Sequence, residues 1–257
     1  WYHCYRCSFG LTYPECDTAC ARFLEETIVN EQEGTVAAFL AEPVQGSGGM
    51  IPSPPTYWPL VRQICSEHKV LLIADEVMTG FGRTGQLFAV EHWGVRPDIM
   101  TMAKGITSGY VPMAAVALSD SVFQGLTEGA PFFIHGFTYT GHPVGSAVAV
   151  KNMEIIVREK LPENAARQGQ YLLRRLSEFL EFEHVGNVGG LGLMVGLELV
   201  ADKSTRAKLD PARGVGAEVV RQARQKGVLI REFADRIGFG PPLTVTSQDT
   251  DQVVDTL

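Results

Sequence analysis

The sequence predicts an α/β protein with two units. A larger unit in residues 1–160 is built on a mostly parallel sheet, and residues 161–257 form a smaller α/β unit. Three observations support this prediction. Short apolar runs alternate with amphipathic helical patterns in the first part of the chain. Residues 70–74 are continuously apolar, which is typical of a parallel strand buried on both faces. The pattern then changes near Pro162, which interrupts the chain.

The first four elements follow from the spacing of apolar side chains. Residues 19–33 carry them at helical spacing, with charged residues between, and predict a helix. Residues 35–41 are apolar and β-branched, which predicts a strand. Residues 57–68 again place apolar side chains on one helical face, and Pro59 fits there because it lies in the first turn. The apolar strand at residues 70–74 follows.

The rest of the larger unit is predicted to contain two strands and a helix, at residues 98–103, 114–118 and 145–159. The smaller unit is predicted to begin with a helix at residues 164–180. Three strands are predicted at residues 193–200, 227–230 and 236–239, and a second helix at residues 214–226 lies between the first two strands. The last residues, 251–257, have the pattern of a helix that is cut short.

Composition excludes several classes of function. The 257 residues have a net charge of −7 and are 45% hydrophobic, which is an ordinary globular composition. The acidic balance argues against a nucleic-acid partner, which usually meets a basic face. No apolar run approaches the roughly 18 residues of a membrane span. The chain begins with Trp1 and has no signal-peptide pattern, so we expect an interior piece of a longer protein that lacks its N-terminal part.

Five cysteines leave two interpretations open. Cys4 and Cys7, and then Cys16 and Cys20, have roughly the spacing of zinc ligands. They could mark a metal-stabilised binding module without catalysis. The alternative is a set of reduced thiols in an enzyme with no metal. Because five is odd, complete pairing within the chain is impossible, which favours a reducing compartment and predicts a cytoplasmic protein.

Two charged residues follow predicted strands directly. Asp75 comes after residues 70–74, and the carboxyl ends of parallel strands are where ligands bind in open α/β sheets. Lys104 comes after the strand at residues 98–103 and is followed by Gly105. A lysine held in such a place loses its proton more easily and can act as a nucleophile or base. Schiff-base chemistry is one reason for a lysine to lie in such a place.

Three other features are less specific. Residues 80–85 match G-x-G-x-x-G, but the strand ends too early and no clean helix follows, so we interpret them as a glycine-rich turn beside the active site. Thr138 lies among hydroxyls and glycines just before a helix, where a phosphate can bind. Arg231 is expected to end the strand at residues 227–230, and a planar guanidinium there is suited to a carboxylate.

Four segments together resemble the class III pyridoxal-phosphate-dependent aminotransferases of fold type I. They are AEPVQGSGG at residues 41–49, LIADEVMTGFGRTG at 72–85, PDIMTMAKG at 97–105 and FTYTGHP at 137–143. The order of the segments agrees with the family, and the likeness runs from the first residues to the last. Residues 103–112, AKGITSGYVP, are most similar to the branch of ω-amino acid and amine:pyruvate aminotransferases.

The resemblance implies a role for seven residues. Lys104 would link covalently to the aldehyde of pyridoxal 5'-phosphate, and Asp75 would pair with its ring nitrogen. Val77 would pack on the ring, and Thr138 would bind the cofactor phosphate across the interface of a homodimer. Arg231 would grip a substrate carboxylate. Two further positions would line the substrate pocket, Ser47 and Met78. No metal ligand is implied.

The resemblance also implies the reaction and the division of the chain. Residues 1–160 would be part of the large cofactor-binding domain, and residues 161–257 the C-terminal small domain. The small-molecule partners would be an amine or ω-amino acid donor and a keto acid acceptor, with pyruvate expected. An aminomutase or another ω-amino acid transaminase remains an alternative on the same scaffold. The phosphate-binding loop and stacking Tyr of the family lie upstream of Trp1, and Gly189 stands where relatives often carry Arg.

Overall fold

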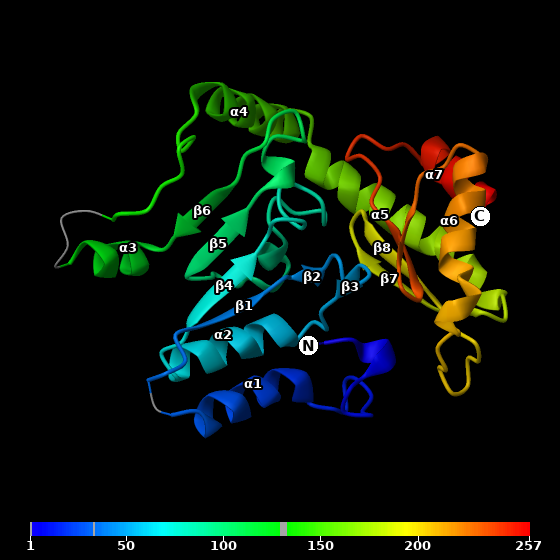
Figure 1. Ribbon diagram of the computed structural model, residues 1–257, viewed down its shortest axis with the longest axis horizontal. Helices are drawn as coiled ribbons and strands as arrows, with labels where there is room; N and C mark the ends of the chain where they lie inside the picture. Colours follow the sequence, from blue (N-terminus) through cyan, green and yellow to red (C-terminus); the bar gives the residue numbers. More distant parts are fainter. Residues whose placement is uncertain (1, 33, 129–132) are drawn as a thin grey trace.

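The computed structural model describes residues 2–32, 34–128 and 133–257, which are arranged around two main sheets (Figure 1). The first sheet has the order β1-β4-β5-β6, formed by Ala38–Ala41, Leu71–Asp75, Ile99–Met102 and Ala115–Leu118. β1, β4 and β5 are parallel to one another, and β6 is antiparallel to β5. The mostly parallel sheet predicted for this part of the chain is therefore confirmed.

Two helices, α1 (Ala19–Asn30) and α2 (Tyr57–Glu67), pack against this sheet (Figure 1). The core between them and the strands contains Trp58 of α2 with Leu72 and Ala74 of β4, all with no exposed surface. This amphipathic packing explains why helical spacing in the sequence located both helices. The helix predicted over residues 19–33 ends earlier, and residue 33 lies outside the described residues.

The prediction that residues 70–74 are buried on both faces is wrong for the described chain. Side chains alternate along β4, so that Leu72 and Ala74 face the core while Leu71 is 36% exposed and Ile73 is half-buried. Neighbouring β1 shows the same openness, since Leu40 is 57% exposed. The apolar character of both faces is real, but only one of them is fully covered.

Two further helices and a hairpin complete the larger part. α3 (Asp120–Thr127) follows β6, and α4 (Pro143–Arg158) packs on the turn that begins at Lys104. β2 (Val44–Gln45) and β3 (Ile51–Pro52) form a small antiparallel hairpin. Helical spacing in the sequence predicted α4, but no pattern predicted α3 or the hairpin, whose strands are only two residues long.

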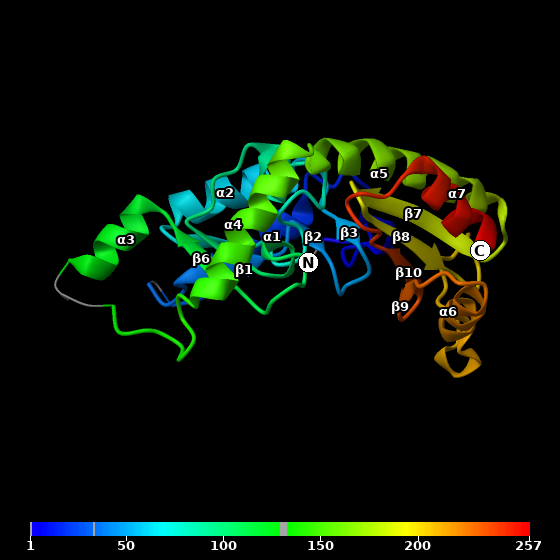
Figure 2. The same ribbon diagram turned by 90° about the horizontal axis from the view of Figure 1, so that it is seen from above.

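The second sheet is antiparallel throughout and has the order β7-β8-β10-β9. Its strands are Val185–Leu191, Met194–Leu199, Arg236–Phe239 and Arg231–Phe233. Three helices pack on it, α5 (Leu161–Ser177), α6 (Val215–Gln225) and α7 (Ser247–Thr256). Seen from above, α5 and α7 lie on one side of this sheet and α6 lies near β9 (Figure 2).

One strand prediction in this region needs correction, and one strand was not predicted. Residues 227–230 are not a strand, because Gly227 takes a left-handed φ of +87° and Leu229 is 81% exposed. The strand begins instead at Arg231, which places this arginine at the start of β9 rather than at the end of the preceding segment. β7 was missed because its glycines give it no β-branched pattern. Among the described residues, no helix combines the length and apolar character that a membrane span requires.

Candidate active site

Asp75 and Lys104 lie at the same edge of the first sheet. β4 and β5 are parallel neighbours, and Asp75 pairs in register with Thr101, three residues before Lys104. Both side chains therefore leave the carboxyl ends of adjacent strands, as the sequence predicted. The half-buried Asp75 uses Oδ1 to accept a hydrogen bond from the Val77 amide at 3.0 Å. Its other carboxylate oxygen has no protein partner among the described residues.

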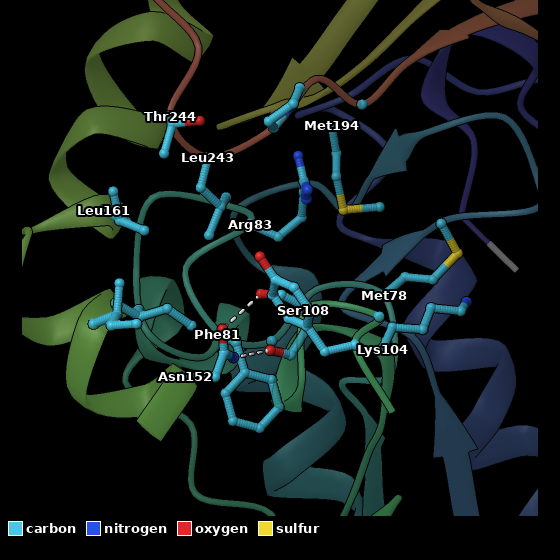
Figure 3. A pocket seen from close by; sticks show the side chains of 18 of the residues that line it. Met78, Phe81, Arg83, Lys104, Ser108, Asn152, Leu161, Met194, Leu243 and Thr244 are labelled. Atoms are coloured by element: carbon cyan, nitrogen blue, oxygen red, sulfur yellow. Dashed lines mark hydrogen bonds between the residues drawn. The ribbon is translucent and has the colours of Figure 1, made fainter. Parts of the chain in front are cut away.

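Lys104 begins a 3-10 turn, Lys104–Ile106, and has a left-handed φ of +45°. Its side chain makes no hydrogen bond or ion pair with any described residue, so the amine is not committed to a structural role. It lines a cavity of about 730 Å³ together with Met78 (Figure 3). A free amine and a carboxylate with a free oxygen are the two groups that pyridoxal phosphate needs from these strands, so this edge fits the cofactor.

The cavity lies between the two parts of the molecule (Figure 3). Its walls on the side of the first sheet include Phe81, Ser108 and Asn152. Met194 of β8 and Leu243, in the segment after β10, contribute from the second part. Three methionine side chains gather on one wall, Met50, Met78 and Met194. A substrate at Lys104 would therefore meet a flexible, apolar wall.

Arg83 is a cavity-lining cation that the sequence analysis quoted but did not assign. Its guanidinium donates hydrogen bonds to the carbonyls of Pro241 and Leu193, and its own carbonyl accepts one from the Leu193 amide at 3.0 Å. Burial lowers the pKa of Arg83. These bonds tie the glycine-rich turn at residues 80–85 to the second part. The turn borders the cavity, as interpreted from the sequence.

Glu76, next to Asp75, was also missed. It has no exposed surface and accepts hydrogen bonds from the Thr79 hydroxyl and, at 2.9 Å, from the Val90 amide. Burial raises the pKa of Glu76, although these hydrogen bonds act in the opposite direction. The side chain fixes the segment after β4 to the 3-10 helix Ala89–Trp93. An acidic residue directly after an apolar strand was the signal available in the sequence.

Five of the seven predicted site residues are not among those that line the cavity, and three of these five are exposed. Ser47 is exposed in the turn after β2, and Thr138 is exposed in the segment before α4. Arg231 is exposed and its guanidinium lies over the ring of Phe233, 5.2 Å from the centroid. Val77 is half-buried beside Asp75. The structure thus brings together Asp75, Val77, Met78 and Lys104, and the assigned roles of all seven residues stay predictions.

The four N-terminal cysteines do converge in space. Cys4, Cys7, Cys16 and Cys20 line one small cavity of about 20 Å³. Burial and the neighbouring thiols raise the pKa of Cys4, and burial is also the main reason that the pKa of Cys20 is raised. Within the described ranges, no group of three His, Cys, Asp or Glu side chains is arranged to hold a metal ion. The alternative of a metal-stabilised module therefore has no ligand set there.

Comparison with known proteins gives consistent matches over almost the whole chain. The sequence profile of the family described as Aminotransferase class-III matches residues 5–257. The putrescine–pyruvate aminotransferase of Pseudomonas aeruginosa is 42% identical over 91% of this chain and 51% of its own length. The diaminobutyrate–2-oxoglutarate transaminase of Halomonas elongata is 42% identical over 95% of this chain and 54% of its own.

A solved structure agrees closely in fold. The amine transaminase of an uncultivated Pseudomonas species, in a form with bound pyridoxal phosphate, superposes with a TM-score of 0.95 and 44% identity. The match covers 98% of this chain and 58% of that one. The chain thus spans about half the length of the relatives it matches.

Proposed function

The chain belongs to the class III aminotransferases, an enzyme family that uses pyridoxal 5'-phosphate, and from that premise we propose a reaction for the whole protein. It transfers an amino group from an amine or ω-amino acid to a keto acid, with pyruvate as the acceptor. One observation carries the proposal. Lys104 offers a free amine at the carboxyl edge of β5, beside the half-buried Asp75 on the adjacent parallel strand.

The residues at this edge have distinct tasks in the proposed reaction. The bound cofactor supplies an electron sink for the charge that develops at the substrate carbon. Asp75 would hold the cofactor at its ring nitrogen and keep that nitrogen protonated. Lys104 would hold the cofactor, and its freed amine would take a proton from the substrate carbon as a general base and deliver it to the cofactor carbon as a general acid. Val77 presents an apolar surface to the ring.

Substrate recognition is proposed to combine an apolar wall with a mobile cation. Met78 and the other methionines of the cavity wall suit the apolar part of an amine. The exposed Arg231 is free to swing toward a substrate carboxylate and away from an amine that lacks one. Ser47 would contribute to the same pocket. The name of the Pseudomonas aeruginosa relative supports pyruvate as the acceptor.

A homodimer with shared active sites is part of the proposal. Large apolar side chains are exposed before and at the start of α4, including Phe137 at 77%, Tyr139 at 79% and Val144 at 59%. Such a group of exposed side chains is typical of a protein interface. Thr138 lies within it and would bind the cofactor phosphate in the partner's site. The proposed location is the cytoplasm.

Covalent labelling tests the central assignment. The full-length protein is mixed with pyridoxal phosphate, reduced with borohydride and mapped by peptide mass spectrometry. We expect the label on Lys104, visible absorbance before reduction, and loss of both in Lys104→Arg. Attachment to another lysine, such as Lys69 or Lys160, would contradict the assignment.

A further inference from the structure

The turn that begins at Lys104 is held in an unfavourable backbone conformation. Lys104 and Ser108 have φ values of +45° and +51°, in the left-handed region that side chains disfavour. Such residues persist only where the surroundings enforce them, and they gather at functional sites. The turn's own backbone hydrogen bonds are long: the Ile106 amide donates to the Ala103 carbonyl at 3.1 Å, the Thr107 amide to the Lys104 carbonyl at 3.2 Å and the Ser108 amide to the Gly105 carbonyl at 3.3 Å.

Asn152 of α4 supplies the missing restraint (Figure 3). Its amide group donates to the carbonyls of Gly105 at 2.8 Å and Ile106 at 3.1 Å. Its oxygen accepts from the Ser108 hydroxyl at 2.8 Å. Only 9% of Asn152 is exposed, and both donors and the acceptor of the amide are used. A single side chain therefore binds the turn at three points.

The opposite side of the turn is closed by packing. A Cβ atom added at Gly105 would lie 3.0 Å from the Cβ of Phe81 and 3.3 Å from the Gly80 carbonyl oxygen. The turn is thus pressed between the glycine-rich segment and α4. Packing restrains the turn on the side of Phe81 and Gly80, and the Asn152 bonds restrain it on the side of α4.

We propose that Asn152 is a positioning residue that holds the Lys104–Ile106 turn in place, with Lys104 in its left-handed conformation, and so directs the Lys104 amine toward the edge that carries Asp75. The proposal rests on the proposed function, because the direction of this amine matters only if it reacts. Asn152 acts through the turn and does not touch the reacting atoms. Its position on the buried stripe of α4, between Ala149 and Ile156, is where an apolar residue would otherwise be expected.

The experiment compares matched asparagines in the full-length protein. Asn164 on α5 is the control, because its amide also donates to two backbone carbonyls, those of Leu243 at 2.7 Å and Val245 at 3.1 Å, but lies away from the turn. Asn152→Ala and Asn164→Ala are compared for hydrogen exchange at the Ile106 and Thr107 amides without cofactor. The rate at which added pyridoxal phosphate links to the protein is followed by visible absorbance.

We expect Asn152→Ala to speed exchange and slow attachment by about tenfold or more each, since the buried Ile106 carbonyl loses its donor and the part-buried Gly105 carbonyl keeps only the Ser108 amide at 3.3 Å. Asn164→Ala should leave both rates unchanged, even where its melting temperature falls by a similar amount. Ser108→Ala removes only one of the three bonds and should change both rates by about threefold in the same direction. If Asn152→Ala does not fold, the proposal is tested with Ser108→Ala instead.

Each other outcome decides against the proposal. Equal rates in Asn152→Ala and Asn164→Ala, with Lys104 still labelled in the unaltered protein, would overturn the positioning role alone. An unchanged Ser108→Ala would do the same if Asn152→Ala failed to fold. Failure of the unaltered protein to link the cofactor at Lys104 would overturn the proposed function and this inference together.

Discussion

At the scale of single residues, the two charged side chains assigned to binding stand in opposite environments. Asp75 is half-buried and has one oxygen fixed by a backbone amide, so its free oxygen has a defined direction. Arg231 is exposed and touches an aromatic ring, so it has several orientations open to it. A fixed group suits a cofactor that stays, and a mobile group suits substrates that alternate.

Asp75→Asn is expected to retain the cofactor but to lower turnover about a thousandfold. The amide cannot stabilise a proton on the ring nitrogen, and an ion pair worth about 4 kcal/mol in a dry site corresponds to that loss. The measurement is steady-state turnover with cofactor content determined in parallel. Asp98→Asn is the control, because the Asp98 carboxylate binds Arg62 and the Leu72 amide at the opposite end of the strands. Near-normal turnover in Asp75→Asn would contradict the proposed role.

Arg231→Ala is expected to lower the efficiency with a keto acid about 10²-fold, because a charge-assisted pair worth about 2–3 kcal/mol is lost. The half-reaction with an amine lacking a carboxylate should change far less. Arg231→Lys should restore only part of the loss, since it keeps the charge but not the planar fork. Single-turnover kinetics with both substrates distinguish these cases. Equal losses for the two substrates would point to a structural role for Arg231.

Sequence motifs identified the residues that are expected to touch the cofactor. They did not identify the residues that hold the surrounding backbone in place. Asp75 and Lys104 follow apolar strands, and that pattern is visible without a structure. Asn152 and Arg83 act by donating to backbone carbonyls of segments far away in the chain, at Gly105 and Pro241. Nothing in the local sequence reports such a partner. A polar residue on a buried helical stripe was the only signal for Asn152.

At the scale of elements, the periodic spacing of apolar side chains predicted the regular helices and strands. It failed where glycines interrupt a strand or where one face of a strand is exposed. Helices α1, α2 and α4 were found because their apolar faces meet a core. β7 was not found because its glycines interrupt the strand pattern, and one of them is required by close backbone packing: a Cβ at Gly190 would lie 2.4 Å from the Met194 carbonyl oxygen. The boundary near residue 160 remains a prediction, although α5 begins at Leu161.

Gly169→Ala is expected to destabilise the protein although alanine favours helices. Gly169 lies inside α5, and a Cβ there would come within 2.2 Å of the Gly192 carbonyl oxygen. Overpacking against a rigid backbone costs about 1–3 kcal/mol, which exceeds the gain in helix propensity. Gly125→Ala in α3, where nothing lies within 4 Å, should instead stabilise by roughly 0.5–1 kcal/mol. Urea unfolding of both variants measures whether the free energy of unfolding falls or rises. A rise in Gly169→Ala would show that the backbone near Gly192 moves to make room for the added methyl group.

At the scale of the whole molecule, one buried carboxylate joins the second sheet to the N-terminal segment and, through Arg236, to the β2–β3 hairpin. Glu198 of β8 is bonded by His3 and Arg6 of the N-terminal segment and by Arg236 of β10. Arg236 also donates to the Gly49 carbonyl at 2.6 Å, in the turn of the β2–β3 hairpin. Only 1% of Glu198 is exposed. Segments from the start, middle and end of the chain therefore meet at this carboxylate.

Acid is expected to weaken this junction. Burial alone would raise the pKa of Glu198, but the hydrogen bonds from His3 and Arg6 and the charge of Arg236 outweigh it and hold the pKa below its ordinary value of 4.5. The unfolded chain therefore takes up this proton first as the pH falls. The stabilisation is complete above the ordinary value and is lost progressively below it, as the pH approaches the folded-state pKa.

Unfolding free energies at several pH values test this expectation. Glu198→Gln should lose about 3 kcal/mol near neutral pH, because buried cations are left without their counter-charge, and should lack this part of the acid response. Glu218→Gln is the control, since that carboxylate pairs with Arg221 at the surface and should matter little. An acid response that is identical in Glu198→Gln and the unaltered protein would refute the assignment.

The methionine wall of the cavity bears on how the substrate range of such a protein could be changed by directed evolution. Met50, Met78 and Met194 come from three separate segments, yet they pack in one apolar cluster. Substitutions of residues in contact are not additive, so a scan of single positions would misjudge their value. A combinatorial library that varies the three codons together would sample combinations of side chains at these positions. It would leave untouched the backbone contacts at Gly169 and Gly192, which tolerate no added atoms.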